Sequence, residues 1–235
     1  MKIGLASYEF KNGDVSFNLR QMEQAMAEAQ GRVDLLCFGE AFLQGFDGLI
    51  WQYDYDKNVA IAPDSPVMEQ LKAMTVRYGV DLLFGYLERD GERIYSSCAV
   101  LQDGAWIHNY RRISPGWKEY DLTDDHYCEG EATAPFLYRG RTLQVALCGD
   151  LWAHPERFVT DGLLIWPVYL NFSLEDWHAS EQEYAQHARQ VAREALVVNP
   201  LSRDPRSHGG AFHFRDGEIV EKLDFDREGV LIAEV

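Results

Sequence analysis

Apolar residues follow two spacings along the chain. Short continuous runs are typical of buried strands, and a recurrence every three to four residues is typical of amphipathic helices. Leu19, Met22 and Met26 show the helical recurrence, and Ser65 followed by Pro66 has the pattern of a capped helix start. Helices are therefore predicted over residues 15–30, from residue 66 and over residues 176–194, and strands over residues 3–8, 33–38, 80–86, 142–148, 163–170 and 196–199.

Two aspartate–glycine pairs add antiparallel hairpins to this alternation of strands and helices. Asp103-Gly104 separates strand-like runs at residues 94–102 and 105–110, and Asp216-Gly217 forms a second such turn. Hairpins combined with crossover helices imply mixed sheets. No linker or repeat interrupts the pattern, so we expect one α/β domain over residues 1–235. Its helices should cover the outer faces of sheets whose inner faces pack together.

Charge and composition narrow the range of partners. The 235 residues are 46% hydrophobic and carry a formal net charge of −16. Such an acidic surface repels nucleic-acid backbones and anionic lipids, so neither is expected as a partner. The longest apolar run spans only residues 163–170, whereas a membrane-spanning helix needs about 20 residues. We expect a cytoplasmic protein that acts on a small molecule.

The cysteines and histidines do not form the motifs of metal sites or disulfide frameworks. The four cysteines are widely spaced and include no Cys-x-x-Cys pair. No His-x-His or His-Glu-x-x-His motif occurs, although the loop at residues 125–128 holds an aspartate, a histidine and a cysteine. We therefore expect no disulfide, no metal and no organic cofactor.

Three reactive side chains follow predicted strands. Glu40 comes after a buried strand, Arg112 after the first hairpin, and Cys148 after the apolar run at residues 142–147. If these strands are neighbours in one sheet, an acid, a cation and a thiol meet at one edge. A free thiol has a pKa near ~8.5 and needs a base or a cation to act as a nucleophile. Arg112 and the N–H of Gly149 could then stabilise an oxyanion.

In this order, the three segments resemble the nitrilase superfamily of carbon–nitrogen hydrolases, which uses a Glu–Lys–Cys triad. The resemblance implies that Glu40 is the general base, Cys148 the nucleophile and Glu119 an auxiliary glutamate. Residues 209–217 resemble a late hairpin of the family. The implied fold is a four-layer α-β-β-α sandwich with two mixed sheets, which usually forms homodimers through its helices.

One departure from the family concerns the catalytic lysine, because Arg112 stands in its place. Arginine can hold an oxyanion, but its pKa above ~12 prevents it from donating a proton. Lys118 is a second candidate cation, and Trp152 is a candidate wall of the substrate pocket. The predicted reaction is hydrolysis of a small linear amide or carbamoyl compound through a Cys148 thioester. The alternative is an inactive nitrilase-like protein that binds a ligand or regulates another protein.

Overall fold

The strands form two six-stranded mixed sheets and one small hairpin in a computed structural model that describes residues 1–235. The first sheet has the order β14-β1-β2-β3-β4-β5, with β1 and β3 parallel to β2 and the other neighbours antiparallel. Its strands are β1 (Lys2–Ser7), β2 (Leu35–Cys37), β3 (Asp81–Asp90), β4 (Arg93–Gln102), β5 (Ala105–Arg111) and β14 (Gly229–Glu234).

The second sheet repeats this plan in the order β13-β12-β9-β8-β7-β6, with β7, β8 and β9 parallel. Its strands are β6 (Phe136–Tyr138), β7 (Arg141–Val145), β8 (Leu163–Pro167), β9 (Glu194–Val198), β12 (Ala211–Arg215) and β13 (Glu218–Leu223), and the separate hairpin is β10 (Leu201–Arg203) with β11 (Arg206–His208).

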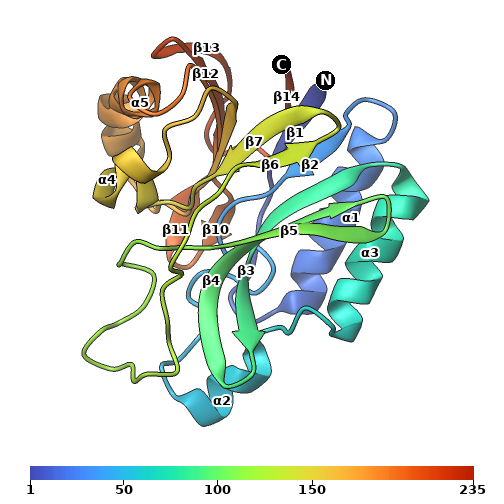
Figure 1. Ribbon diagram of the computed structural model, residues 1–235, viewed down its shortest axis with the longest axis vertical. Coiled ribbons are helices and arrows are strands. Elements are labelled where there is room, and N and C mark those ends of the chain that lie inside the picture. The colour runs from blue at the N-terminus through green and yellow to red at the C-terminus, as the bar shows by residue number, and fades with distance from the viewer.

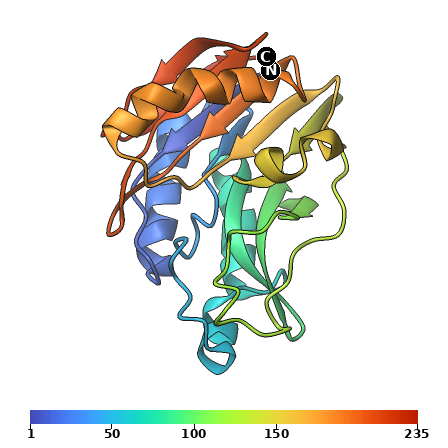
Figure 2. The ribbon, with the colours of Figure 1, turned by 90° about the vertical axis from the view of Figure 1, so that its left-hand side faces the viewer.

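Helices cover the outer faces of the two sheets, so the molecule has the expected order of helix, sheet, sheet and helix (Figure 1, Figure 2). On one side lie α1 and α3, and on the other lies α5, which contacts β9, β12 and β13. None of the helices is long and apolar enough to cross a membrane. The helices are α1 (Val15–Ala29), α2 (Tyr53–Val59), α3 (Pro66–Tyr78), α4 (Asp150–Ala153) and α5 (Leu174–Arg189), with a 3₁₀ turn at Pro155–Arg157.

Alternation along the strands divides the core into two large clusters. Cys98 and Val100 of β4 belong to the cluster between the sheets, whereas Ala99 and Leu101 belong to the cluster beneath α1 and α3. Because successive side chains of a strand point to opposite faces, both faces of the first sheet are buried. This arrangement gives β4 an inner face directed at the second sheet, and polar residues on that face lie inside the protein.

Local capping signals mark the starts of α3 and α5, but the predicted bounds of the last helix differ from those of α5. Ser65 caps α3 by accepting a hydrogen bond from the Met68 N–H at 3.3 Å, and α3 begins at Pro66 as predicted. The prediction of a helix over residues 176–194 is wrong at both ends. A capping box between Ser173 and Asp176 starts α5 at Leu174, and the chain leaves the helix after Arg189 because residues from Glu194 pair in β9.

Candidate active site

Glu40, Arg112 and Cys148 meet where the two sheets face each other. Their strands are not neighbours in one sheet, so the condition under which the sequence brings them together at one sheet edge does not hold. Glu40 follows β2 and Arg112 follows β5, with β3 and β4 between these strands, and Cys148 follows β7 in the other sheet. The Glu40 N–H donates to the Val168 carbonyl just beyond β8 at 3.2 Å, which joins the two sheets at this point. The three side chains therefore converge across the interface between the sheets.

The Glu40 carboxylate is fully buried, and only one of its two oxygens is hydrogen-bonded. Its Oε1 accepts hydrogen bonds from Arg112 Nη1 and from Ser96 Oγ, each at 2.9 Å. Its Oε2 is also buried but has no hydrogen-bond partner. A Cβ on Gly85 would lie 2.6 Å from the Cα of Glu40, so glycine is what allows β3 to pass this close. The unpartnered Oε2 is the oxygen that can accept a proton.

The Arg112 guanidinium is fixed by three acceptors in a buried position. Besides Glu40, Nε donates to Ser114 Oγ at 2.8 Å and Nη2 donates to the Pro115 carbonyl at 2.7 Å. Of its five N–H groups, two remain for a further acceptor. A Cβ on Gly149 would lie 2.6 Å from Nη2, so the glycine brings this cation against the turn that carries the thiol.

Opposing effects set the pKa of Arg112. Burial lowers the pKa of this guanidinium, but the negative charge of Glu40, aided by Cys148 and Asp150, outweighs burial and raises it above the ordinary arginine value. Arg112 is therefore a permanent cation in the site. It can stabilise negative charge but cannot supply a proton.

Cys148 sits in a tight turn with a left-handed backbone, at φ 38°. Such a conformation is uncommon for a residue with a side chain and is often found at functional sites. Its N–H donates to the Pro167 carbonyl at 3.0 Å, and its carbonyl accepts from Trp166 Nε1 at 2.9 Å. The thiol lies 3.7 Å from the Tyr169 carbonyl. The N–H of Gly149 donates to no group of the protein, which leaves it free for a substrate oxygen.

Burial raises the pKa of the Cys148 thiol to about 12, with a further contribution from the negative charge of Glu40. Arg112 acts in the opposite direction and lowers this pKa. The resting side chain is therefore a neutral thiol at physiological pH. A nucleophilic attack by Cys148 needs a base that takes the proton as the new bond forms.

Asp150 ties the segments of the site together. Its carboxylate accepts hydrogen bonds from the Tyr110 hydroxyl at 2.6 Å and from the backbone N–H groups of Ile113, Ser114 and Leu147 at 3.2, 2.9 and 2.8 Å. One buried side chain thus holds the chain just after Arg112 and the turn that carries the thiol. Asp150 therefore orients the turn after the thiol through backbone hydrogen bonds.

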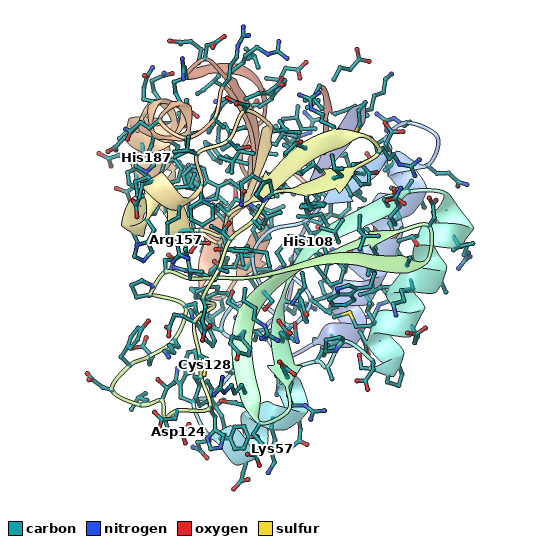
Figure 3. All side chains as sticks on the ribbon, in the orientation of Figure 1. Lys57, His108, Asp124, Cys128, Arg157 and His187 are labelled. Atoms are coloured by element: carbon teal, nitrogen blue, oxygen red, sulfur yellow. The ribbon has the colours of Figure 1, made fainter.

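The other three candidates make no hydrogen bond or ion pair with Glu40, Arg112 or Cys148. Glu119 is exposed, and its carboxylate makes no hydrogen bond or ion pair. Nζ of Lys118 donates to the Tyr127 carbonyl and to Oε2 of Glu129, the latter at 3.1 Å. Trp152 is partly exposed, and its ring stacks on His187 of α5 with the ring centroids 3.9 Å apart (Figure 3). It also packs edge-on against Tyr184 at 5.2 Å.

A cavity of about 970 Å³ lies elsewhere in the molecule. It lies between the long loop that follows β5 and residues of β4 and β5, including Arg93, Tyr95 and Arg111. Cys128 and Asp124 of this loop also line it (Figure 3). Glu40, Arg112 and Cys148 do not line this cavity. The candidate active site is therefore the region around Cys148 and not this cavity.

Sequence reasoning missed Ser96 and Ser114. Ser96 lies in the strand run at residues 94–102, in register with the apolar inner-facing residues Cys98 and Val100. A hydroxyl in that position needs a buried partner, and this was the available signal. Ser114 follows Arg112 by two residues, in a segment with no periodic pattern.

Comparisons with known proteins extend over the whole chain. The sequence model of the carbon–nitrogen hydrolase family matches residues 2–235. A nitrilase from Talaromyces marneffei is 28% identical, and the match covers 95% of this chain and 81% of the nitrilase. An (R)-stereoselective amidase from a Pseudomonas species is 26% identical, over 64% of this chain and 52% of the amidase.

A solved structure matches the fold. This is a cysteine-to-serine variant of Nesterenkonia AN1 amidase from the nitrilase superfamily, with a TM-score of 0.82 and 17% identity over 100% of this chain and 91% of that one. The resemblance that was read from the sequence is thereby confirmed, as is the fold of two mixed sheets between helices. The chain belongs to the carbon–nitrogen hydrolase family of the nitrilase superfamily.

Proposed function

We propose that this protein hydrolyses the C–N bond of a small linear amide or carbamoyl compound through a thioester on Cys148. One observation carries the proposal. A buried carboxylate, Glu40, has one oxygen bound to a permanent cation and the other free, and its charge acts on the Cys148 thiol. Nitrilase and amidase relatives support the same class of reaction.

In the first half of the reaction, Cys148 Sγ attacks the carbonyl carbon while Oε2 of Glu40 takes the thiol proton. The carbonyl oxygen gains negative charge, which the free N–H groups of Arg112 and the N–H of Gly149 stabilise. One such donor is typically worth ~3–4 kcal/mol. The proton then passes from Glu40 to the leaving nitrogen, the C–N bond breaks, and ammonia or an amine departs.

In the second half, water attacks the thioester carbon and Glu40 takes a proton from that water. The C–S bond breaks, the thiolate recovers the proton from Glu40, and the carboxylic or carbamic acid leaves. Every proton passes through Glu40 because the guanidinium of Arg112 cannot release one. Arginine in the lysine position is thus compatible with turnover.

An amide suits the site better than a nitrile for a physical reason. Arg112 and Gly149 offer several N–H donors beside the thiol, and these match a carbonyl oxygen that becomes an oxyanion. A nitrile presents one linear nitrogen, which gains less from donors that approach from two segments.

The test is a panel of linear amides, carbamoyl compounds and nitriles, with ammonia release as the readout. Cys148→Ala should abolish turnover while the circular dichroism spectrum and melting temperature stay close to wild type. Cys128→Ala, at a half-buried position on the long loop, is the matched control and should keep wild-type rates. Full activity of Cys148→Ala contradicts the proposal. Compounds that bind without being hydrolysed favour the ligand-binding alternative.

A further inference from the structure

Ser96 and Arg112 are cross-strand neighbours on the inner face of the first sheet. The β4–β5 register pairs Ser97 with Arg111, and the Arg112 N–H donates to the Ser96 carbonyl at 2.9 Å. Both side chains are buried and both donate to Oε1 of Glu40. Two donors from two strands therefore hold one carboxylate oxygen, and the other oxygen has no partner.

We propose that Ser96 is a positioning residue, which keeps Oε1 of Glu40 bound so that Oε2 stays directed at the Cys148 thiol. The proposal deepens the proposed function, because it concerns the same base. Ser96 touches neither the thiol nor a substrate, and it acts only through Glu40.

Without the Ser96 hydroxyl, Arg112 could bind both carboxylate oxygens of Glu40. A guanidinium prefers to bind both oxygens of a carboxylate through two parallel N–H donors. Arg112 has N–H groups to spare, yet only one of them contacts Glu40. The terminal torsion of a glutamate is broad, so rotation into the two-pronged arrangement costs little. The Ser96 hydroxyl opposes this rotation by a second bond to Oε1, which approaches from β4.

Four ionisable groups lie around the thiol and belong to different segments. They are Glu40 after β2, Arg112 after β5, Asp150 at the start of α4, and Tyr184 of α5, whose pKa is raised mainly by burial and also by Cys148. Of these four groups, only Glu40 accepts a hydrogen bond from the Ser96 hydroxyl. A change in the behaviour of the thiol after removal of the Ser96 hydroxyl therefore reports on Glu40.

The neighbouring Ser97 offers a matched control. It is also fully buried, and its hydroxyl donates to Oε2 of Glu88 at 2.5 Å. Because it is the next residue of β4, its side chain points to the opposite face of the sheet. Ser97→Ala removes an equivalent buried serine–glutamate hydrogen bond at a place that is remote from the thiol.

The first measurement needs no substrate. The rate of Cys148 alkylation by iodoacetamide is followed against pH by peptide mapping in Ser96→Ala, Ser96→Thr and Ser97→Ala. In Ser96→Ala, Oε2 leaves the thiol and the profile moves to lower pH, with alkylation about threefold or more faster at pH 8. Ser96→Thr keeps the hydroxyl and should restore the wild-type profile. An unchanged profile in Ser96→Ala overturns the inference.

The second measurement is turnover of an amide that the wild type hydrolyses. Ser96→Ala should lower kcat by about 10- to 100-fold and leave KM within about threefold of wild type, because Glu40 is misdirected but substrate binding is unaffected. Equal kcat in Ser96→Ala and Ser97→Ala also overturns the inference and leaves the proposed function intact. If the wild type hydrolyses no amide but the alkylation profile still shifts, the proposed function fails and the positioning role stands.

Discussion

Arg112 Nη1 lies 2.9 Å from Glu40 Oε1, and neither side chain is open to solvent. Two opposite charges that are buried together tolerate each other, but either one alone is costly because water cannot replace the lost partner. The ion pair therefore makes the stability of the fold depend on the residues that we assign to the reaction.

A double-variant cycle tests this dependence. Arg112→Met should cost about 3–5 kcal/mol in the free energy of unfolding, because it leaves the Glu40 carboxylate buried without its cation. Arg112→Met combined with Glu40→Gln removes both charges and should cost clearly less than the sum of the two single variants. Urea unfolding of the four proteins gives the coupling energy. Additive costs would show that the two charges do not stabilise each other.

Alkylation of Cys148, which proceeds through the thiolate and needs no base, should become faster when the charge of Glu40 is removed. Burial and the negative charge of Glu40 together raise the thiol pKa to about 12, against the opposing effect of Arg112. Glu40→Gln removes the negative charge and keeps the cation, so the thiol pKa falls and more thiolate is present at pH 8. We expect faster alkylation of Cys148 by iodoacetamide in this variant, together with loss of amide turnover. Slower alkylation would contradict the electrostatic origin of the high pKa.

Much of the fold was predictable because its signals are local. The hairpin that was expected at residues 94–102 and 105–110 forms as β4 (Arg93–Gln102) and β5 (Ala105–Arg111) around Asp103-Gly104. The elements that were missed, α2 (Tyr53–Val59), β6 (Phe136–Tyr138) and the hairpin of β10 and β11, have short or irregular patterns and depend on tertiary contacts.

The site was predictable only where a strand end fixes the residue. Glu40, Arg112 and Cys148 each follow a strand closely, and the structure brings all three together. Glu119 and Lys118 belong to a long loop without periodicity. The direction of the Lys118 side chain is set by its ion pair with Glu129 and its hydrogen bond to the Tyr127 carbonyl. Such contacts leave no pattern in a single sequence.

Asp150 should be difficult to replace even by asparagine. Its two carboxylate oxygens accept from one hydroxyl and three backbone N–H groups. In Asp150→Asn an NH₂ group would face some of these donors, which leaves buried N–H groups without an acceptor at a cost of about 2–4 kcal/mol. Because Asp150 joins the segments of Arg112 and Cys148, turnover should fall as well.

Urea unfolding and amide turnover measure both effects of this change. Tyr110→Phe is the matched control, because it removes a single donor to Asp150 and should cost only about 1–1.5 kcal/mol. If Asp150→Asn is no more harmful than Tyr110→Phe, the backbone N–H groups of Ile113, Ser114 and Leu147 do not depend on the carboxylate.

His108 should make stability depend on pH near neutrality. Its ring lies between β5 and β6, stacked on Phe136 at 4.1 Å, and so helps to join the two sheets (Figure 3). Burial lowers the pKa of His108 below its ordinary value. The unfolded chain therefore takes up a proton at higher pH than the folded one, and the free energy of unfolding falls as the pH drops through about 6.5.

His108→Phe keeps a ring in this position and removes the titration. The variant should lose less stability than the wild type between pH 8 and pH 5, as measured by urea unfolding at several pH values. His178→Phe is the control, since His178 is exposed on α5 and also contacts a phenylalanine ring, Phe225. Parallel pH profiles for the wild type and His108→Phe would show that the histidine is already free to protonate between the sheets. A flatter profile for His108→Phe alone identifies the contact between β5 and β6 as the point where acid weakens the packing of one sheet on the other.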